Sequence, residues 1–231
     1  MSSQPNQSLL DGIRCLQYLV SSGKAMGGRE LARQMNMNST RVNRLLMTMA
    51  SAGLMMQDAQ RRYLPGPGIH ALAAQAIRGS SLFSRALPQL EAHAPHDIVV
   101  ALGVLWEDQV IYIWHAEPGA RTSQALAGFQ MQPACQSVIG VSLLAAEPDE
   151  GLRQRLGDAQ WRSVEGLLCQ QREKGHLIWH HDSGEIAMAQ PLYSNRAALA
   201  FAKIWQTDDA AIQQRLTQLQ ALALRLVNAS A

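Results

Sequence analysis

The chain has 231 residues, of which 47% are hydrophobic and 16% are charged, and this composition excludes a disordered protein. Lys and Arg number 20 against 18 Asp and Glu, a net charge of +2, and the longest apolar run, residues 98–106, is far too short to span a membrane. A chain of this length is expected to form one or two domains.

Two further features favour a cytoplasmic protein without a membrane partner. The cysteines Cys15, Cys135 and Cys169 are widely spaced and do not form the pattern of a disulfide framework. The first ten residues, MSSQPNQSLL, lack the cationic and apolar segments of a secretory signal.

The charge is divided unevenly along the chain. Residues 1–80 contain nine basic and three acidic residues, a net charge of +6. Residues 81–231 contain 11 basic and 15 acidic residues, a net charge of −4. Such asymmetry indicates a nucleic-acid-binding part joined to a part with another task.

Three helices are predicted near the N-terminus. Residues 8–22 place Leu9, Ile13, Leu16 and Val20 on one helical face, which we expect to be buried. A short helix follows over 28–35, and a third helix begins after Asn38, whose side chain suits an N-cap.

The third helix is amphipathic, and Gly53 ends it. At 100° per residue, its apolar stripe consists of Val42, Leu45, Leu46 and Met49. The opposite side, with its flanks, has no acidic residue and consists of Thr40, Arg41, Asn43, Arg44, Met47, Thr48 and Ser51. We expect this face to be the DNA-reading surface.

A β-hairpin is predicted over residues 54–65, with a polar turn at residues 58–60. Its second strand carries Arg61, Arg62 and Tyr63. Three helices followed by a hairpin predict a winged helix-turn-helix, with the hairpin as the wing. The segment Pro65-Gly66-Pro67-Gly68 then breaks the chain, and the Ala-rich residues 69–79 predict a linker or dimerisation helix.

The acidic part mixes helices and strands. Strand pairs are predicted over 98–106 with 110–115 and over 186–193 with 197–205. Helices are predicted over 82–93, 136–146, 162–174 and 208–228. An antiparallel sheet flanked by helices makes the fold class α+β, with a sensor-like second domain.

Nine residues are candidate DNA contacts. Arginines at a helix start can pair with guanine edges or phosphates, Asn43 can pair with adenine, hydroxyls can bind phosphate, and the wing arginines suit phosphate or the minor groove. The free N–H groups at the start of the third helix are expected to add phosphate contacts. The alternative is an ordinary solvated surface. The candidates are Arg29, Ser39, Thr40, Arg41, Asn43, Arg44, Thr48, Arg61 and Arg62.

These motifs resemble the IclR family of bacterial transcription regulators. The resemblance lies in SLLDGIRCLQYL, RELARQMNMNSTRVNRLLMTMASAGLM and RRYLPGPGIHALA, and continues more weakly through LWEDQVIYIWHAEPGA, GFQMQPACQSVIGVSLLA and EKGH…GEIAMAQPLY. Asn43 stands where the family usually has His, Arg41 where Thr is common, and Ala187 where Cys or Ser is usual, and the family's acidic stretch is shortened to HHDSGE.

The resemblance implies a winged helix-turn-helix over 1–66, a linker helix over 67–80, and a GAF- or profilin-like effector-binding and oligomerisation domain over 81–231. It further implies a homodimer or dimer of dimers on a palindromic DNA operator. A repressor is favoured over an activator, and the position of the operator decides between the two. The effector would be a small molecule, an organic acid or a sugar derivative.

The effector site is expected where a helix start, a hairpin end and a strand converge. A helix start favours a carboxylate or phosphate. Buried packing is the alternative for these side chains, as it is for the five Trp residues that follow residue 100. The candidates are His115, Arg121, Cys135, Gln136, Ser137, Val138, Ala187 and Ala189.

Two other functions compete with a ligand-responsive regulator. The second domain could serve dimerisation alone and bind no effector, which the shortened acidic stretch and Ala187 favour. An enzyme is the remote alternative, because no P-loop, nucleophile elbow, HExxH or dinucleotide motif is present. Cys169, His176, His180 and His181 match no zinc spacing, so we expect no metal and no cofactor.

Overall fold

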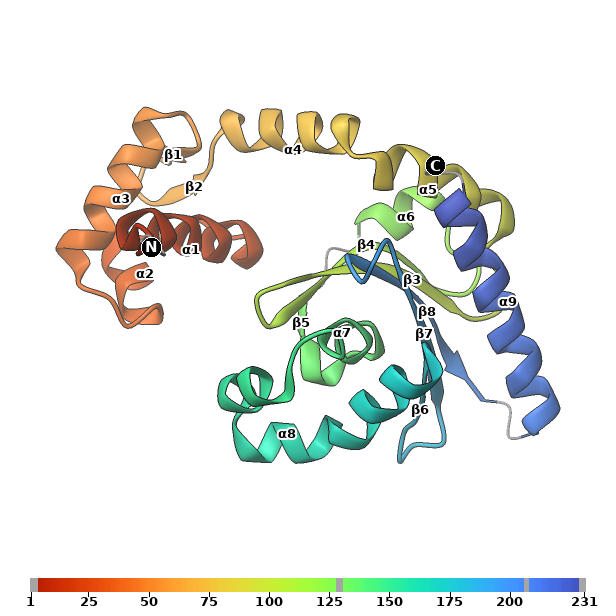
Figure 1. Cartoon of the computed structure of the whole chain (residues 1–231). Helices are drawn as coiled ribbons and strands as arrows, with labels where there is room; N and C mark the ends of the chain where they lie inside the picture. Colours follow the sequence, from red (N-terminus) through yellow and green to blue (C-terminus); the bar gives the residue numbers. More distant parts are fainter. Residues whose placement is uncertain (1–3, 128–130, 206–207, 229–231) are drawn as a thin grey trace. The chain divides into compact units, whose positions relative to one another are not determined.

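The structure, a computed structural model, describes residues 4–127, 131–205 and 208–228. The chain divides into two compact units, Met1–Ser80 and Ser81–Ala231 (Figure 1). The division into three domains at residues 66 and 80 stays a prediction. None of the helices in the described part is long and apolar enough to cross a membrane.

The first unit is a winged helix-turn-helix. Asn6 and Asn38 begin α1 and α3, because the side chain of each accepts hydrogen bonds from two free backbone N–H groups of the helix. The predicted capping role of Asn38 is therefore confirmed. The elements are α1 (Gln7–Ser22), α2 (Gly28–Gln34), α3 (Ser39–Ser51), β1 (Met55–Gln57), β2 (Tyr63–Pro65) and α4 (Pro67–Gly79).

The predicted buried face of α1 is wrong for most of its residues. Leu9, Ile13 and Val20 are 63%, 40% and 43% exposed, whereas Cys15 and Leu19 are fully buried. The helix carries apolar residues on two sides, and the side with Cys15 and Leu19 packs into the core that contains Leu31, Val42 and Leu46. The other apolar side lines an open groove beside α3.

The wing forms as predicted. Strands β1 and β2 pair antiparallel, from Met55 opposite Pro65 to Gln57 opposite Tyr63. Helix α4 follows with Pro67 in its first turn, and not one of its thirteen residues is buried. Helix α4 therefore contributes no buried residue to the core of the first unit.

The second unit is built on one antiparallel sheet of six strands in the order β5-β4-β3-β8-β7-β6. The two central hairpins, the helices α5, α7 and α9 and the second half of α8 were predicted from the sequence. The elements are α5 (Ser81–His93), β3 (Val99–Trp106), β4 (Gln109–Ala116), α6 (Thr122–Ala127), β5 (Met131–Pro133), a 3-10 turn (Ala134–Gln136), α7 (Val138–Leu144), α8 (Asp149–Lys174), β6 (Leu177–His180), β7 (Ile186–Leu192), β8 (Ala197–Ile204) and α9 (Asp209–Asn228).

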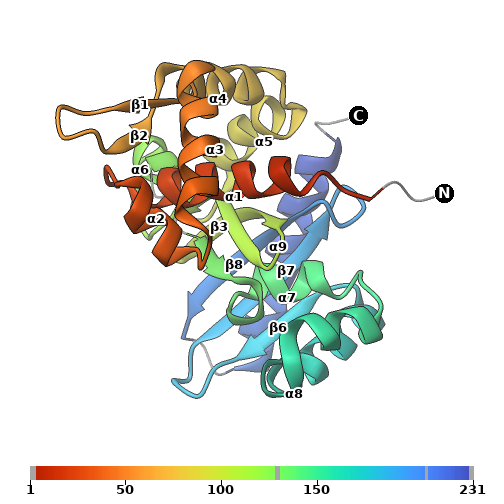
Figure 2. The same cartoon turned by 90° about the vertical axis from the view of Figure 1, so that its left-hand side faces the viewer.

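Helices cover both faces of this sheet (Figure 2). On one face α5 and α9 enclose a core around Phe201, Leu199 and Leu219. On the other face α7 and α8 enclose a second core around Ile139 and Leu168. The α+β class and the antiparallel sheet are thus confirmed.

Three short elements and half of a helix escape the sequence analysis. The edge strands β5 and β6 and the short helix α6 have at most six residues each, too few for a periodic pattern. Helix α8 begins at Asp149 rather than at residue 162. Its first part is strongly polar and breaks at Gly157, where φ is +76°.

Candidate nucleic-acid interface and effector core

The outer face of α3 is exposed as predicted and presents seven side chains to solvent. The face includes a large apolar residue, Met47, which is 64% exposed and is not among the nine candidate DNA contacts. The helical pattern places Met47 opposite the buried stripe of α3, and this position predicts that its side chain is exposed. The exposed residues are Ser39, Thr40, Arg41, Arg44, Met47, Thr48 and Ser51.

The start of α3 is less open to phosphate than the sequence analysis expected. The Asn38 side chain accepts hydrogen bonds from the backbone N–H groups of Thr40, at 2.9 Å, and Arg41, at 3.2 Å. These two N–H groups are therefore already paired. The hydroxyls of Ser39 and Thr40 stay exposed beside them.

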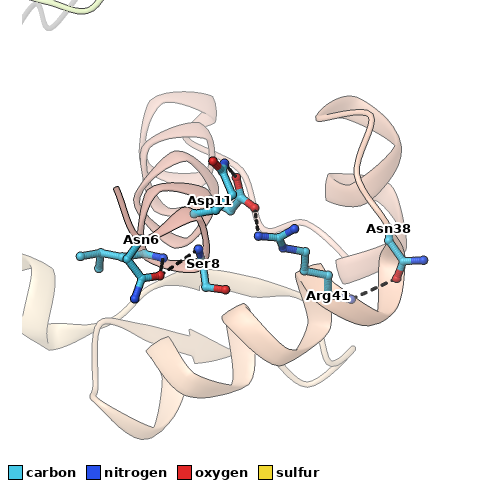
Figure 3. Close-up of polar contacts among 7 residues, drawn as sticks. Asn6, Ser8, Asp11, Asn38 and Arg41 are labelled. Carbon is cyan, nitrogen blue, oxygen red and sulfur yellow. Dashed lines mark hydrogen bonds and ion pairs between the residues drawn. The ribbon is translucent and has the colours of Figure 1, made fainter. Parts of the chain in front are cut away.

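Arg41 forms an ion pair across the unit (Figure 3). Its guanidinium lies 2.5 Å from a carboxylate oxygen of Asp11 on α1. The Asp11 side chain is 8% exposed, whereas that of Arg41 is 44% exposed. The second Asp11 oxygen accepts a hydrogen bond from Gln7 Nε2 at 2.9 Å. Sequence analysis missed Asp11, because the pair joins positions thirty residues apart.

Arg44 is one of the residues that line a groove of about 810 Å³ between α1 and α3. The groove is lined by the apolar side chains of Leu9, Ile13 and Leu45. Among the described residues, none forms an ion pair with Arg44. Arg44 thus combines exposure with a free charge on the predicted reading face.

Asn43 is turned toward α2. It is half-buried, and a Cβ placed on Gly28 would lie 1.9 Å from Asn43 Oδ1. The close approach of α2 and α3 therefore depends on the missing side chain of Gly28. The expected pairing of Asn43 with adenine stays a prediction.

The two wing arginines differ in their surroundings. Arg62 Nε lies 2.8 Å from Asp58 Oδ2, and the other oxygen of Asp58 accepts the backbone N–H groups of Gln60 and Arg62. These contacts, the Arg62 backbone N–H first, lower the pKa of Asp58 below its ordinary value of 3.8. Arg61 is exposed and adopts a left-handed backbone, with φ of 59°. Arg29 is exposed in the first turn of α2.

In the second unit, the structure brings some effector candidates together around Tyr112. The Tyr112 hydroxyl lies 2.9 Å from Ser137 Oγ and donates to Gln132 Oε1 at 3.0 Å. The His115 ring meets the Tyr112 ring edge-on, with centroids 5.4 Å apart. Burial raises the pKa of Tyr112. Tyr112 and Gln132 were missed, because Tyr112 lies inside an apolar strand and Gln132 in a three-residue strand.

Other candidates form the packing beneath α7. Cys135, Val138, Ala187 and Ala189 belong to the core between the sheet and α7, whose seven residues are all buried. A Cβ on Gly140 would lie 2.2 Å from the Ala134 carbonyl oxygen, so α7 lies very close to the turn before it.

The last two candidates stand apart from this core. Gln136 is exposed. Arg121 precedes α6, whose buried Ala125 packs into the core on the opposite face of the sheet. Neither is placed in contact with Tyr112 by the described interactions.

The cysteine and histidine side chains of the second unit lie in separate surroundings. Burial raises the pKa of the Cys135 thiol. Near the second strand pair, His181 stacks on Trp179 at 4.8 Å and His176 Nδ1 lies 3.1 Å from the Lys174 carbonyl oxygen. In the described ranges, no three His, Cys, Asp or Glu side chains gather as metal ligands would.

No protein-family model matches the chain, and no protein of curated function matches it. Solved structures do match over its whole length. An IclR transcriptional regulator from Alicyclobacillus acidocaldarius is 25% identical, with a TM-score of 0.73 over 99% of this chain and 100% of that chain. An IclR regulator from a Silicibacter species is 18% identical, with a TM-score of 0.79 over 96% of each chain.

A third match contains a ligand. It is an IclR homologue from Microbacterium hydrocarbonoxydans in complex with 4-hydroxybenzoate. It is 20% identical to this chain, with a TM-score of 0.69 over 97% of this chain and 99% of that chain. At this identity, the likeness concerns the fold.

Proposed function

We propose that the chain, which shares its fold with IclR-family transcriptional regulators over almost its whole length, is a regulator of that family that binds a specific DNA sequence and controls transcription in response to a small metabolite. The observation that carries this proposal is the exposed face of α3, which has no acidic residue and lies in a unit of net charge +6. Such a face suits the negative major groove.

The DNA contacts divide by chemistry. The exposure of Arg44 supports pairing with a guanine edge, and that of Ser39, Thr40 and Thr48 supports hydroxyl contacts to phosphates or bases. Arg61 on the wing and Arg29 on α2 suit phosphate contacts. Arg41 and Arg62 have partners within the chain, and their contribution to binding depends on those partners. Asn43 is half-buried and lies close to Gly28 of α2.

The functional form is proposed to be a homodimer or a dimer of dimers on a palindromic operator. Helix α4 supports this, since it buries none of its residues and exposes Leu72 by 53% and Ile77 by 45%. A second copy packed on this helix would cover them and set the spacing of two half-sites. The protein would act in the cytoplasm, as a repressor.

The proposed effector is an organic acid or a sugar derivative that binds at Tyr112, Ser137 and Gln132. The bound 4-hydroxybenzoate of the Microbacterium homologue supports a small acid. The three polar groups already bond to one another, so a ligand would exchange these bonds for its own.

A second candidate function is regulation without an effector. Helix α7 packs directly on Ala187 and Ala189, and this tight packing favours a domain that only joins subunits. A thermal-shift screen of organic acids and sugar derivatives, with 4-hydroxybenzoate included, separates the two. A stabilising ligand whose effect is lost in Tyr112→Phe and kept in Tyr193→Phe supports effector binding; no stabilisation by any compound supports the second candidate.

The DNA-binding proposal is tested by selecting duplexes from a random pool with the full-length protein. We expect enrichment of a palindromic sequence, which fluorescence anisotropy should show to bind at least 10³-fold more tightly than random DNA. Failure to enrich any sequence would reject sequence-specific binding.

A further inference from the structure

The first unit contains a buried carboxylate that the DNA-binding proposal does not use. Asp11 is 6% exposed, and among the described Asp and Glu residues it is the one that is buried. In the described part of the chain, Arg41 of α3 pairs with one of its oxygens and Gln7 of α1 donates a hydrogen bond to the other. The arrangement is seen in Figure 3, where the Asp11 and Arg41 side chains point toward one another from different helices.

Arg41 is held at both ends. Its backbone N–H donates to Asn38 Oδ1, and its guanidinium pairs with Asp11 Oδ2. A buried carboxylate that loses its partner is strongly unfavourable, because desolvation is then no longer compensated. If the Arg41 guanidinium left Asp11 to contact a DNA base, the first unit would therefore lose stability, because Asp11 would be buried without a cation.

Arg44 is in the opposite situation. It lies three residues later on the same helix, is exposed, and has no ion pair among the described residues. An exposed guanidinium can bind guanine or phosphate without breaking an internal contact.

We propose that Arg41 is a positioning residue, which Asp11 holds so that α1 is fixed against the first turn of α3, and that Arg44 is the arginine of α3 that meets the DNA. This inference rests on the proposed function. Both arginines lie on α3, but Arg41 supports the structure of the unit and Arg44 contacts the DNA.

The test is a rescue experiment on the full-length protein. The probe is a duplex enriched from a random pool by the wild-type protein, and affinity is measured by anisotropy at several salt concentrations. The variants are Arg41→Gln, Asp11→Asn/Arg41→Gln, and the matched pair Arg44→Gln and Asp11→Asn/Arg44→Gln. Thermal unfolding of each variant without DNA is followed by circular dichroism.

We expect Arg41→Gln to lower both Tm and affinity, because Asp11 loses its cation. Neutralising Asp11 as well should restore Tm toward the wild-type value and affinity to within about two-fold of it. Arg44→Gln should leave Tm unchanged and weaken binding by roughly 5- to 150-fold, and Asp11→Asn should not restore it.

Two results would overturn the inference. One is an Asp11→Asn/Arg41→Gln protein with wild-type Tm that still binds as weakly as Arg44→Gln, with a salt slope flatter by about 0.9 per lost phosphate contact. The other is an Arg41→Gln protein with unchanged Tm. If the pool yields no enriched sequence, the proposed function fails, while the Tm comparison still decides whether Asp11 and Arg41 form the pair.

Discussion

At the scale of single residues, the polar side chains around α3 differ in whether their partners lie nearby in the chain or on another helix. The hydroxyls and arginines of α3 lie on the exposed face that the helical pattern predicts. The capping role of Asn38 is also predictable, because its partners are the next residues of the chain. The pairing of Arg41 with Asp11 is not, since it depends on how α1 crosses α3.

The wing turn should respond to acid through Asp58. Its pKa is lowered below 3.8 in the folded protein, first by the Arg62 backbone N–H, so the carboxylate supports the turn above that value and the support is lost as the pH falls through the lowered pKa. Amide shifts of Gln60 and Arg62, followed by NMR, should titrate with a midpoint below 3.8. A midpoint at or above 3.8 would contradict the Asp58 contacts, and Asp58→Asn should abolish the titration.

At the scale of elements, the hydrophobic periodicity of the sequence predicts the presence of a helix more reliably than it predicts which side of the helix is buried. Helix α1 has two apolar sides, and only tertiary packing selects Cys15 and Leu19 over Leu9 and Ile13. Strands β5 and β6 have three and four residues, and sheet pairing rather than local pattern forms them.

The contact of α7 with the preceding turn gives a prediction at this scale. Gly140→Ala should destabilise the second unit by about 1–3 kcal/mol, because the new Cβ would collide with the Ala134 carbonyl. Gly151→Ala in α8 is the matched control, since its Cβ meets nothing within 4 Å and should be neutral or stabilising by up to about 1 kcal/mol. Urea unfolding measures both; equal effects would contradict the packing described for α7.

At the scale of the whole molecule, the charge division is the most informative property of the sequence. A net charge of +2 conceals +6 in residues 1–80 and −4 in residues 81–231. The structure divides the chain into compact units at the same place, after Ser80. The effector core was less predictable, because Tyr112 and Gln132 come from separate strands that only the sheet brings together.

Assembly gives a second prediction at this scale. Leu72→Glu should weaken the proposed dimerisation, because a second copy packed on the exposed face of α4 would bury the new carboxylate. Analytical ultracentrifugation should show a shift toward monomer, and affinity for a palindromic duplex should fall with it. Gln75→Glu in the same exposed helix adds the same charge without removing an apolar side chain. A Leu72→Glu protein that sediments like wild type would exclude α4 from the interface.

The central claim is that DNA is bound by α3 and the wing, and that the second unit stays clear of the phosphates. The most direct measurement compares two double charge reversals by anisotropy on the selected duplex: Arg44→Glu/Arg61→Glu in the first unit and Arg162→Glu/Arg225→Glu, at exposed positions of α8 and α9, in the second. The account predicts that the first pair loses specific binding and flattens the salt dependence, while the second stays within about three-fold of wild type. Equal losses from both pairs, or no loss from the first, would contradict it.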